Sequence, residues 1–156
     1  MQRLHNVEGG GRMSYHTWHD YGYGVNLHGL EFNSPERIVE LLSRAPSILE
    51  HVRRELEENG ITEPTVEDYI EYGDFTCGIA GILSEVIEQK EKIFFYVCDD
   101  FDGCKYIMYT PCYPWEMRWR DRRMTKKRIH KILNKYLKII TDSHFDIELV
   151  ESENGG

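Results

Sequence analysis

One stretch, residues 93–115, decides the predicted fold, and it reads IFFYVCDDFDGCKYIMYTPCYPW. Its two flanking runs, Ile93–Cys98 and Cys104–Thr110, are rich in aromatic residues, which suit a pleated and half-buried surface. The acidic turn Asp99–Gly103 joins them and ends in a glycine, a residue that readily adopts a positive φ. Two prolines follow the second run, and proline lacks the N–H that a strand needs to continue. The stretch therefore predicts a β-hairpin, which we place at the centre of a sheet.

On both sides of the hairpin, the spacing of apolar residues predicts further strands and helices. Tyr21, Tyr23 and Val25 alternate with glycines, which indicates a strand with either bulges or a close backbone approach at the glycines. Helix starts are marked by a capping residue or a proline, at Ser34-Pro35, Pro46, Thr65 and Thr125. Apolar residues at helical spacing also predict a buried helix over Ile79–Ile87. A final strand is predicted from the alternating apolar residues Phe145, Ile147 and Leu149.

These elements predict an α+β fold: a three- or four-stranded, mainly antiparallel sheet with a central hairpin, covered by helices on one face. We expect a flexible leader over residues 1–12, a single α+β domain over residues 13–151 and a frayed tail over residues 152–156. No apolar run approaches the roughly 20 residues that a membrane-spanning helix needs. No export signal opens the chain, so a cytoplasmic protein is expected.

Charge is unevenly distributed along the chain, whose formal net charge is −8. Between Glu31 and Asp102 there are eighteen acidic residues. Between Glu116 and Lys138 there are ten basic residues and only two acidic ones. The sequence therefore predicts an acidic body with one basic side, a layout that bears on partners and solubility rather than on the fold.

Signatures of common enzyme classes are missing from the sequence. It contains no GxxxxGK[ST], GxGxxG, GxSxG or HExxH motif. Its four cysteines form no CxxC pair, and without an export signal we interpret all four as thiols. We therefore expect a non-enzymatic protein with no cofactor and no metal. The alternative is a small enzyme that uses a histidine or a cysteine, with the candidates His16, His19, Cys77 and Cys112.

Two aromatic segments supply the predicted partner-binding residues, because tyrosine and tryptophan are enriched at binding hot spots. These residues are Tyr15, Trp18, His19, Tyr21, Tyr23, Tyr113, Trp115 and Trp119. An alternative interpretation is nucleic-acid binding by the stretch Arg118–Lys138, because basic groups interleaved with aromatic ones can bind phosphates and stack bases. The residues of this alternative are Arg118, Arg120, Arg122, Arg123, Lys127 and Lys131. The net charge of −8 opposes long-range attraction to nucleic acid.

Three segments carry a resemblance to a known family: YHTWHDYGYG (Tyr15–Gly24), YIMYTPCYPW (Tyr106–Trp115) and VESENGG (Val150–Gly156). From Met13 on, the chain resembles an uncharacterised family of small proteins from Firmicutes, their phages and integrative elements. The resemblance implies no catalytic residues, but its setting implies an accessory protein that acts on host machinery. Together with the acidic body and the aromatic segments, it predicts a protein-binding, anti-CRISPR-like inhibitor of host defence. The expected partner is a host protein or ribonucleoprotein complex.

Overall fold

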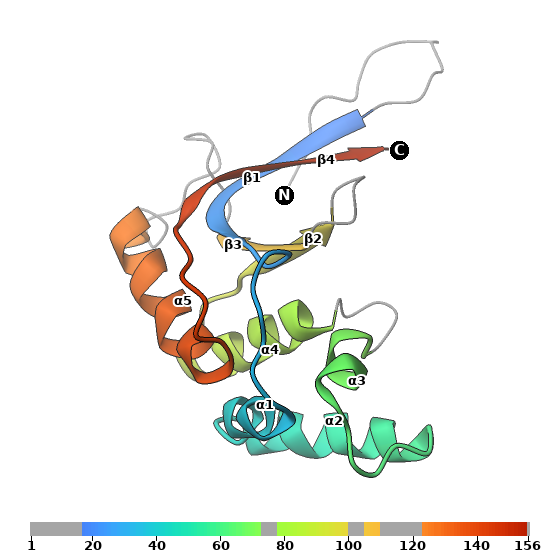
Figure 1. Cartoon of the computed structure of the whole chain (residues 1–156). Helices are drawn as coiled ribbons and strands as arrows, with labels where there is room; N and C mark the ends of the chain where they lie inside the picture. Colours follow the sequence, from blue (N-terminus) through green and yellow to red (C-terminus); the bar gives the residue numbers. More distant parts are fainter. Residues whose placement is uncertain (1–16, 73–77, 100–104, 110–122, 156) are drawn as a thin grey trace.

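The computed structural model describes residues 17–72, 78–99, 105–109 and 123–155, which form an α+β fold (Figure 1). In chain order the elements are β1 (Thr17–Asn26), α1 (Pro35–Leu42), α2 (Pro46–Glu58), α3 (Val66–Ile70), α4 (Ile79–Glu91), β2 (Tyr96–Asp99), β3 (Lys105–Tyr109), α5 (Lys126–Ile140) and β4 (Glu148–Gly155). This order confirms the predicted sequence of a strand, a group of helices, the hairpin, a helix and a strand. The expected leader, residues 1–12, lies outside the described residues.

The four described strands form one antiparallel sheet in the order β2-β3-β1-β4. The predicted hairpin is confirmed, because β2 pairs with β3 in a register that places Val97 opposite Ile107. Its place in the sheet differs from the expected centre: β1 inserts between β3 and β4, so β2 is an edge strand. The second partner of β3 comes from the beginning of the chain, with Val25 opposite Ile107. Such a distant pairing leaves no local trace in the hairpin sequence.

The end of the chain corrects a second expectation. Residues Ser152–Gly155 belong to β4 rather than to a frayed tail, because β4 pairs with β1 from Gly24↔Glu148 to Thr17↔Gly155. The strand begins only at Glu148, after the predicted Phe145 and Ile147. Those two side chains are half-buried and buried respectively, and the ring of Phe145 packs on His130 of α5 at 5.5 Å. Phe145 therefore packs against α5, although the alternation of apolar residues had predicted a strand at this position.

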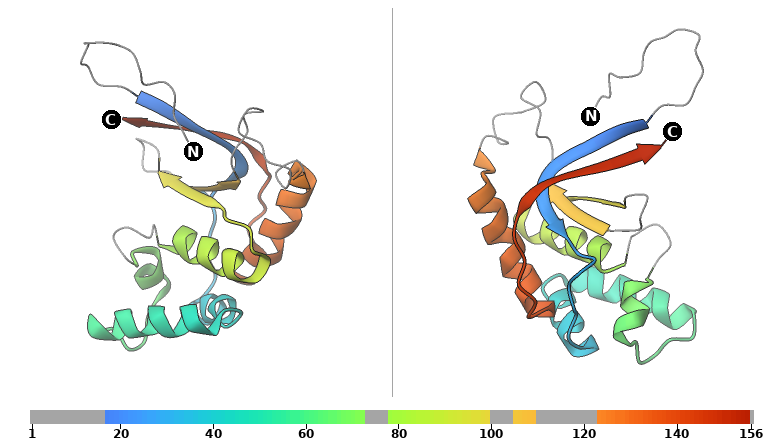
Figure 2. Two further views of the ribbon diagram at one scale, coloured as in Figure 1. Left: turned by 180° about the vertical axis from the view of Figure 1, so that it is seen from behind. Right: turned by 45° about the horizontal axis from the view of Figure 1, so that its top comes forward.

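Helices cover one face of the sheet, as predicted. α4 packs against β2 and β3, α5 packs against β1, and α1, α2 and α3 lie beyond them on the side away from the sheet (Figures 1 and 2). The main core between sheet and helices includes Val25, Phe95, Ile107, Leu83 and Leu133, all at most 1% exposed. The opposite face of the hairpin holds a second, smaller cluster built from Cys98, Met108, Tyr96 and Tyr106.

The helix starts follow the predicted signals. Pro35 and Pro46 each occupy the first turn of a helix, where the missing N–H costs nothing. Thr65 and Asp68 form a capping box at the start of α3, in which each side chain binds the other residue's backbone N–H. The hydroxyl of Thr125 accepts a hydrogen bond from the N–H of Arg128 and caps α5. Local capping chemistry therefore explains where these helices begin.

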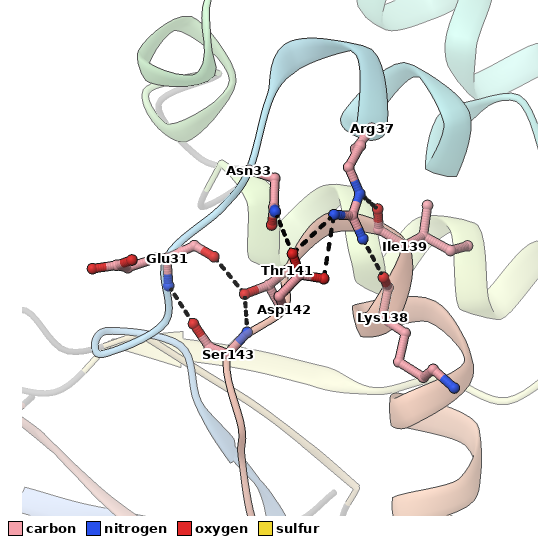
Figure 3. A network of polar contacts seen from close by, with 8 residues as sticks. All are labelled: Glu31, Asn33, Arg37, Lys138, Ile139, Thr141, Asp142 and Ser143. Atoms are coloured by element: carbon pink, nitrogen blue, oxygen red, sulfur yellow. Dashed lines mark hydrogen bonds and ion pairs between the residues drawn. The ribbon is translucent and has the colours of Figure 1, made fainter.

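Two connections between sheet and helices run side by side, as Figure 3 shows. The one after β1 pairs with the one before β4 through the bridge Phe32↔Thr141 and the hydrogen bond from Asn33 N–H to the Ile140 carbonyl at 3.0 Å. The hydroxyl of Thr141 also donates to the carbonyl oxygen of Glu31. This strand-like pairing, which lies outside the sheet, therefore joins the connection that follows β1 to the connection that precedes β4.

Arg37 of α1 completes this connection by binding the end of α5 (Figure 3). Its Nε donates to the carbonyl of Ile139 and its Nη2 to that of Lys138, both at 2.7 Å. Its Nη1 lies 3.3 Å from the carboxylate of Asp142, which also accepts from Asn33 Nδ2 at 2.7 Å. The hydrogen bond from Asn33, followed by that from Arg37, lowers the pKa of Asp142. Arg37 thereby satisfies terminal helix carbonyls that have no partner within α5.

The first prediction concerns the close approach of β1 and β3 at Gly24. A Cβ atom at this position would lie 2.1 Å from the carbonyl oxygen of Ile107 and 2.5 Å from the Cα atom of Met108. Because these are backbone atoms of a paired strand, Gly24→Ala should lower the free energy of unfolding by about 3 kcal/mol or more. Gly29→Ala is the control, since a Cβ there meets nothing within 4 Å. Chemical denaturation of both variants measures the difference, and equal stabilities would contradict the prediction.

The second prediction concerns the contact between Arg37 and the end of α5. Arg37→Ala leaves the carbonyls of Lys138 and Ile139 without their charged donor, so the free energy of unfolding should fall by about 2 kcal/mol. The matched control is Arg44→Ala, because Arg44 has a half-exposed side chain and one ion pair with Glu40 at 3.6 Å. The control should change stability by less than about 0.5 kcal/mol. Thermal and denaturant unfolding measure both, and a loss no larger than that of the control would refute the role given to Arg37.

Candidate protein-binding surface

The charge of the chain is most one-sided in residues 55–89. This stretch contains no lysine, arginine or histidine, and its ten acidic residues are Glu55, Glu57, Glu58, Glu63, Glu67, Asp68, Glu71, Asp74, Glu85 and Glu88. We use the name acidic surface for its seven exposed, described glutamates: Glu57, Glu58, Glu63, Glu67, Glu71, Glu85 and Glu88. They come from the end of α2, the connection to α3, α3 and the residue that follows it, and α4. Three helices therefore contribute negative charge to this part of the molecule.

Nearby cations neutralise the acidic surface little: Arg53 interacts electrostatically with Glu57, but its hydrogen bond and its ion pair are with Glu50. Just before this surface, Arg53 and Arg54 both pair with Glu50, at 2.6 and 3.6 Å. Among the residues that the structure describes, none of the seven carboxylates has an ion pair with a lysine or an arginine. Their negative charge is therefore available to attract a positively charged partner.

A buried tyrosine connects the segment after α3 to α2. The hydroxyl of Tyr72, just after α3, donates to Glu55 of α2 at 2.8 Å. Burial first, then this hydrogen bond, then the charges of Glu55 and Glu85 raise the pKa of Tyr72 far above its ordinary value. Since Glu55 lies on α2 and Glu85 on α4, carboxylates from two helices raise the pKa of this phenol. Tyr72 thus holds α2 and α3 together beneath the acidic surface.

An apolar pocket opens beside these carboxylates. Its volume is about 530 Å³, and its described walls come from the connection after β1, from α3 and from the start of α4. The lining residues are Leu27, His28, Leu30, Glu31, Phe32, Val66, Glu67, Ile70, Ile79 and Ala80. Glu67 belongs both to this lining and to the acidic surface. The pocket was missed by sequence reasoning, because its walls come from three segments that are adjacent only in the fold.

The opposite charge gathers on α5. Lys127, Arg128, Lys131, Lys135 and Lys138 follow one exposed side of the helix, which we call the basic stripe, and α5 contains no acidic residue. The other side of α5 buries Ile129, Leu133, Tyr136 and further apolar residues in the core. In all three views α5 and α3 lie on opposite sides of α4 (Figures 1 and 2). The predicted acidic body with one basic side is therefore seen in the described residues as two separate surfaces.

Glu91, the last residue of α4, joins the two charged regions. Its carboxylate accepts a hydrogen bond from the hydroxyl of Tyr136 at 2.5 Å and lies 3.0 Å from Nζ of Lys135. The hydrogen bond from Tyr136 is the largest cause of a lowered pKa of Glu91, ahead of the contributions of Lys135 and against partial burial. Burial, followed by the hydrogen bond to Glu91, raises the pKa of Tyr136 well above its ordinary range. This small network fixes α5 against α4.

The predicted aromatic residues are only partly within the described structure. Trp18, His19 and Tyr21 lie on β1, where their backbones pair with Asn154, Glu153 and Glu151. Tyr23 is 38% exposed and lies opposite Leu149, which is 58% exposed, so these two residues form an exposed apolar pair on the sheet. Four predicted residues lie outside the described residues: Tyr15, Tyr113, Trp115 and Trp119.

The nucleic-acid alternative and the enzyme alternative are also partly described. Arg123, Lys127 and Lys131 are exposed, and the last two belong to the basic stripe. Cys98 is a buried thiol. Within the described residues, no three His, Cys, Asp or Glu side chains lie close enough together to hold a metal ion. Outside the described residues lie Arg118, Arg120, Arg122, His16, Cys77, Cys104 and Cys112.

Comparison of the chain with protein-family models, curated proteins and solved structures finds no match. Of the five described helices, none combines the length and the apolar character that crossing a membrane requires. The acidic surface, the pocket and the basic stripe are therefore the features from which a function can be argued.

The third prediction concerns the pKa of Glu91. Tyr136→Phe removes the hydrogen bond that contributes most to lowering this pKa, so the pKa of Glu91 should rise toward its ordinary value. In the wild type, Glu91 stabilises the fold above its unfolded pKa of about 4.3, and this contribution is lost as the pH falls through the lower folded pKa. The variant should therefore lose less stability over that acid range. NMR titration of the carboxyl carbon measures the pKa.

Tyr72→Phe is the matched control for this prediction, because it removes a buried hydroxyl that binds a different glutamate, Glu55. The control should leave the pKa of Glu91 unchanged. An unchanged Glu91 pKa in Tyr136→Phe, or an equal rise in Tyr72→Phe, would show that the Tyr136 hydroxyl does not set it.

Proposed function

We propose that this protein is a small, non-enzymatic protein-binding module whose acidic surface binds a basic surface on its partner. The observation that carries the proposal is the acidic surface itself: seven exposed carboxylates, none of which forms an ion pair with a lysine or an arginine among the described residues, and one of which, Glu67, lines an apolar pocket. Stability does not account for such an arrangement, since unneutralised like charges repel one another. The electrostatic energy of these carboxylates becomes favourable when a complementary positive surface approaches.

Electrostatic complementarity of this kind acts mainly on the rate of association and on the choice of partner. A field of several carboxylates attracts a basic surface over about one Debye length, which is about 8 Å at physiological ionic strength. The apolar pocket then supplies the short-range contacts that slow dissociation. A long-range charge field and a local apolar contact are the two elements that specific protein interfaces combine.

For the partner we propose a cytoplasmic host defence complex, such as a CRISPR effector. The resemblance of the chain to small proteins of phages and integrative elements supports this class of partner. The charge layout also supports it, because proteins that hold guide RNA and target DNA do so in positively charged channels. Carboxylates on a rigid helical surface could occupy such a channel and exclude the nucleic acid.

A second candidate function rests on the basic stripe of α5. Its five exposed cations extend from Lys127 to Lys138, about 16 Å along the helix at a rise of 1.5 Å per residue. A row of cations of this length can contact several phosphates of a nucleic-acid backbone. Within a ribonucleoprotein complex, the stripe would bind the RNA or DNA while the acidic surface binds the protein.

The fourth prediction tests the acidic surface by removing charge without changing shape. The triple variant Glu58→Gln, Glu63→Gln, Glu71→Gln alters three exposed residues that do not line the pocket. The control variant Lys127→Gln, Arg128→Gln, Lys131→Gln alters three exposed residues of the basic stripe. Each protein is immobilised and exposed to lysate of a Firmicutes host, with and without nuclease treatment, and captured proteins are quantified by mass spectrometry at low and moderate salt.

We expect the wild type to capture a defined partner whose recovery falls about tenfold in the glutamine triple variant and remains in the basic-stripe control. Recovery should also fall as salt rises, because screening weakens exposed charges. A partner captured equally by all three proteins would refute the role of the acidic surface. Capture that depends on intact nucleic acid and on the basic stripe would instead favour the second candidate function.

A further inference from the structure

The apolar pocket beside the acidic surface combines apolar walls with two carboxylates, Glu31 and Glu67. We propose that it receives a large apolar side chain of a partner peptide that carries lysine or arginine next to that side chain. This inference rests on the proposed function, since it names the contact that gives the acidic surface its specificity.

The lining of the pocket fits an apolar side chain. Leu27, Ile79 and Ala80 are buried, while Leu30, Phe32 and Val66 are half-buried. Ile70 is 36% exposed and so leaves apolar surface in contact with water. Covering such surface with an apolar side chain is favourable, because it removes apolar area from water. The volume of about 530 Å³ lies within the range of about 300–1,000 Å³ that is typical of ligand pockets.

The walls of the pocket are held in place before any ligand arrives. On one side, Glu31 is fixed through its backbone, whose N–H donates to the hydroxyl of Ser143 at 3.0 Å and whose carbonyl accepts from Thr141. On the other side, α3 and the start of α4 approach each other at Gly78, where a Cβ atom would lie 2.0 Å from the carbonyl oxygen of Ile70. Gly78 also has a φ of +60°, a conformation that favours glycine. A preformed pocket requires little ordering on binding.

The rim of the pocket selects for positive charge. Glu31 and Glu67 both line it with exposed carboxylates, and its described lining contains no lysine or arginine. The pocket is also continuous with the acidic surface through Glu67. An anionic or purely apolar ligand would leave these carboxylates uncompensated, whereas an ammonium or guanidinium beside the apolar side chain would pair with them. Charge complementarity therefore assigns the pocket to a basic peptide segment.

The fifth prediction begins with a selection of random twelve-residue peptides displayed on phage against the full chain. We expect the enriched peptides to share a large apolar residue with lysine or arginine within a few positions. The probe for all later measurements is the tightest of these peptides, made synthetically with a fluorescent label. Fluorescence anisotropy gives its Kd, and NMR shifts report whether Ile70 and Ile79 sense it.

Matched variants then test the pocket and its rim separately. Ile70→Trp fills the pocket from an exposed position and should weaken the peptide at least tenfold. Val39→Trp is its control, because Val39 is 40% exposed on α1 and does not line the pocket, and it should leave the Kd within twofold. The double variant Glu31→Gln, Glu67→Gln should weaken binding several-fold, and Glu58→Gln, Glu63→Gln should weaken it less.

Each other outcome overturns the proposal in an identifiable way. An empty selection, or peptides that bind Ile70→Trp as tightly as the wild type, would show that the pocket is not the binding site. Enriched peptides without lysine or arginine would overturn the assigned ligand chemistry. Concentration-dependent dimerisation of the chain, lost in Ile70→Trp, would assign the pocket to a second copy of the chain.

The design separates this inference from the proposed function. One outcome is that basic peptides bind Ile70→Trp as tightly as the wild type but fail to bind the Glu58→Gln, Glu63→Gln, Glu71→Gln triple variant. That result would overturn the pocket assignment and leave the acidic surface supported. Peptides that bind the pocket, together with lysate capture that the triple variant does not reduce, would support the pocket assignment and overturn the role of the acidic surface.

Discussion

The fold depends on how Arg37 closes the junction between the sheet and the helices. Its guanidinium holds the last carbonyls of α5 from a position on α1, so the helix that leads into β4 is fixed to the helix that follows β1. β1 and β4 are in turn neighbours in the sheet. The chain therefore forms a closed arrangement in which two paired strands continue into two connected helices. Because the charge of Arg37 is matched by Asp142 and by helix carbonyls, this junction is polar but well satisfied.

The same arrangement separates the charges of the protein. α5 packs its apolar side on β1 and on the other helices, which leaves its lysines facing solvent. α2, α3 and α4 place their carboxylates on another part of the molecule, and among the described residues the ion pair between Lys135 and Glu91 is the contact between lysine and carboxylate that crosses from α5 to α4. Apart from that pair, folding leaves the basic stripe and the acidic surface unpaired with each other in the described residues. That separation leaves the acidic surface and the basic stripe exposed on different parts of the molecule, and both proposed functions rest on this layout.

Local signals in the sequence predicted the elements well, but not their neighbours. Pro35, Pro46, Thr65 and Thr125 mark helix starts because a helix terminus is a local structure with local requirements. The edge position of β2 and the extension of β4 to Gly155 were not predicted, since strand pairing depends on residues far away in the chain. Of the candidate site, Tyr23, Lys127 and Lys131 are described as exposed, whereas the pocket was missed. In the sequence, the leucines and isoleucines of the pocket look like ordinary core residues. Only the fold brings their three segments together around one opening.

The sequence by itself determined the α+β class, the hairpin, the helices and the strong separation of acidic from basic stretches, because each of these follows from residue types at short spacing. Only the tertiary structure decided the order of the strands, the contact of Arg37 with α5, and the meeting of Leu30, Ile70 and Ile79 at the rim of acidic helices. These features come from contacts between residues tens of positions apart. Such contacts form because burying apolar surface brings whole elements together, and no local pattern records which elements will meet.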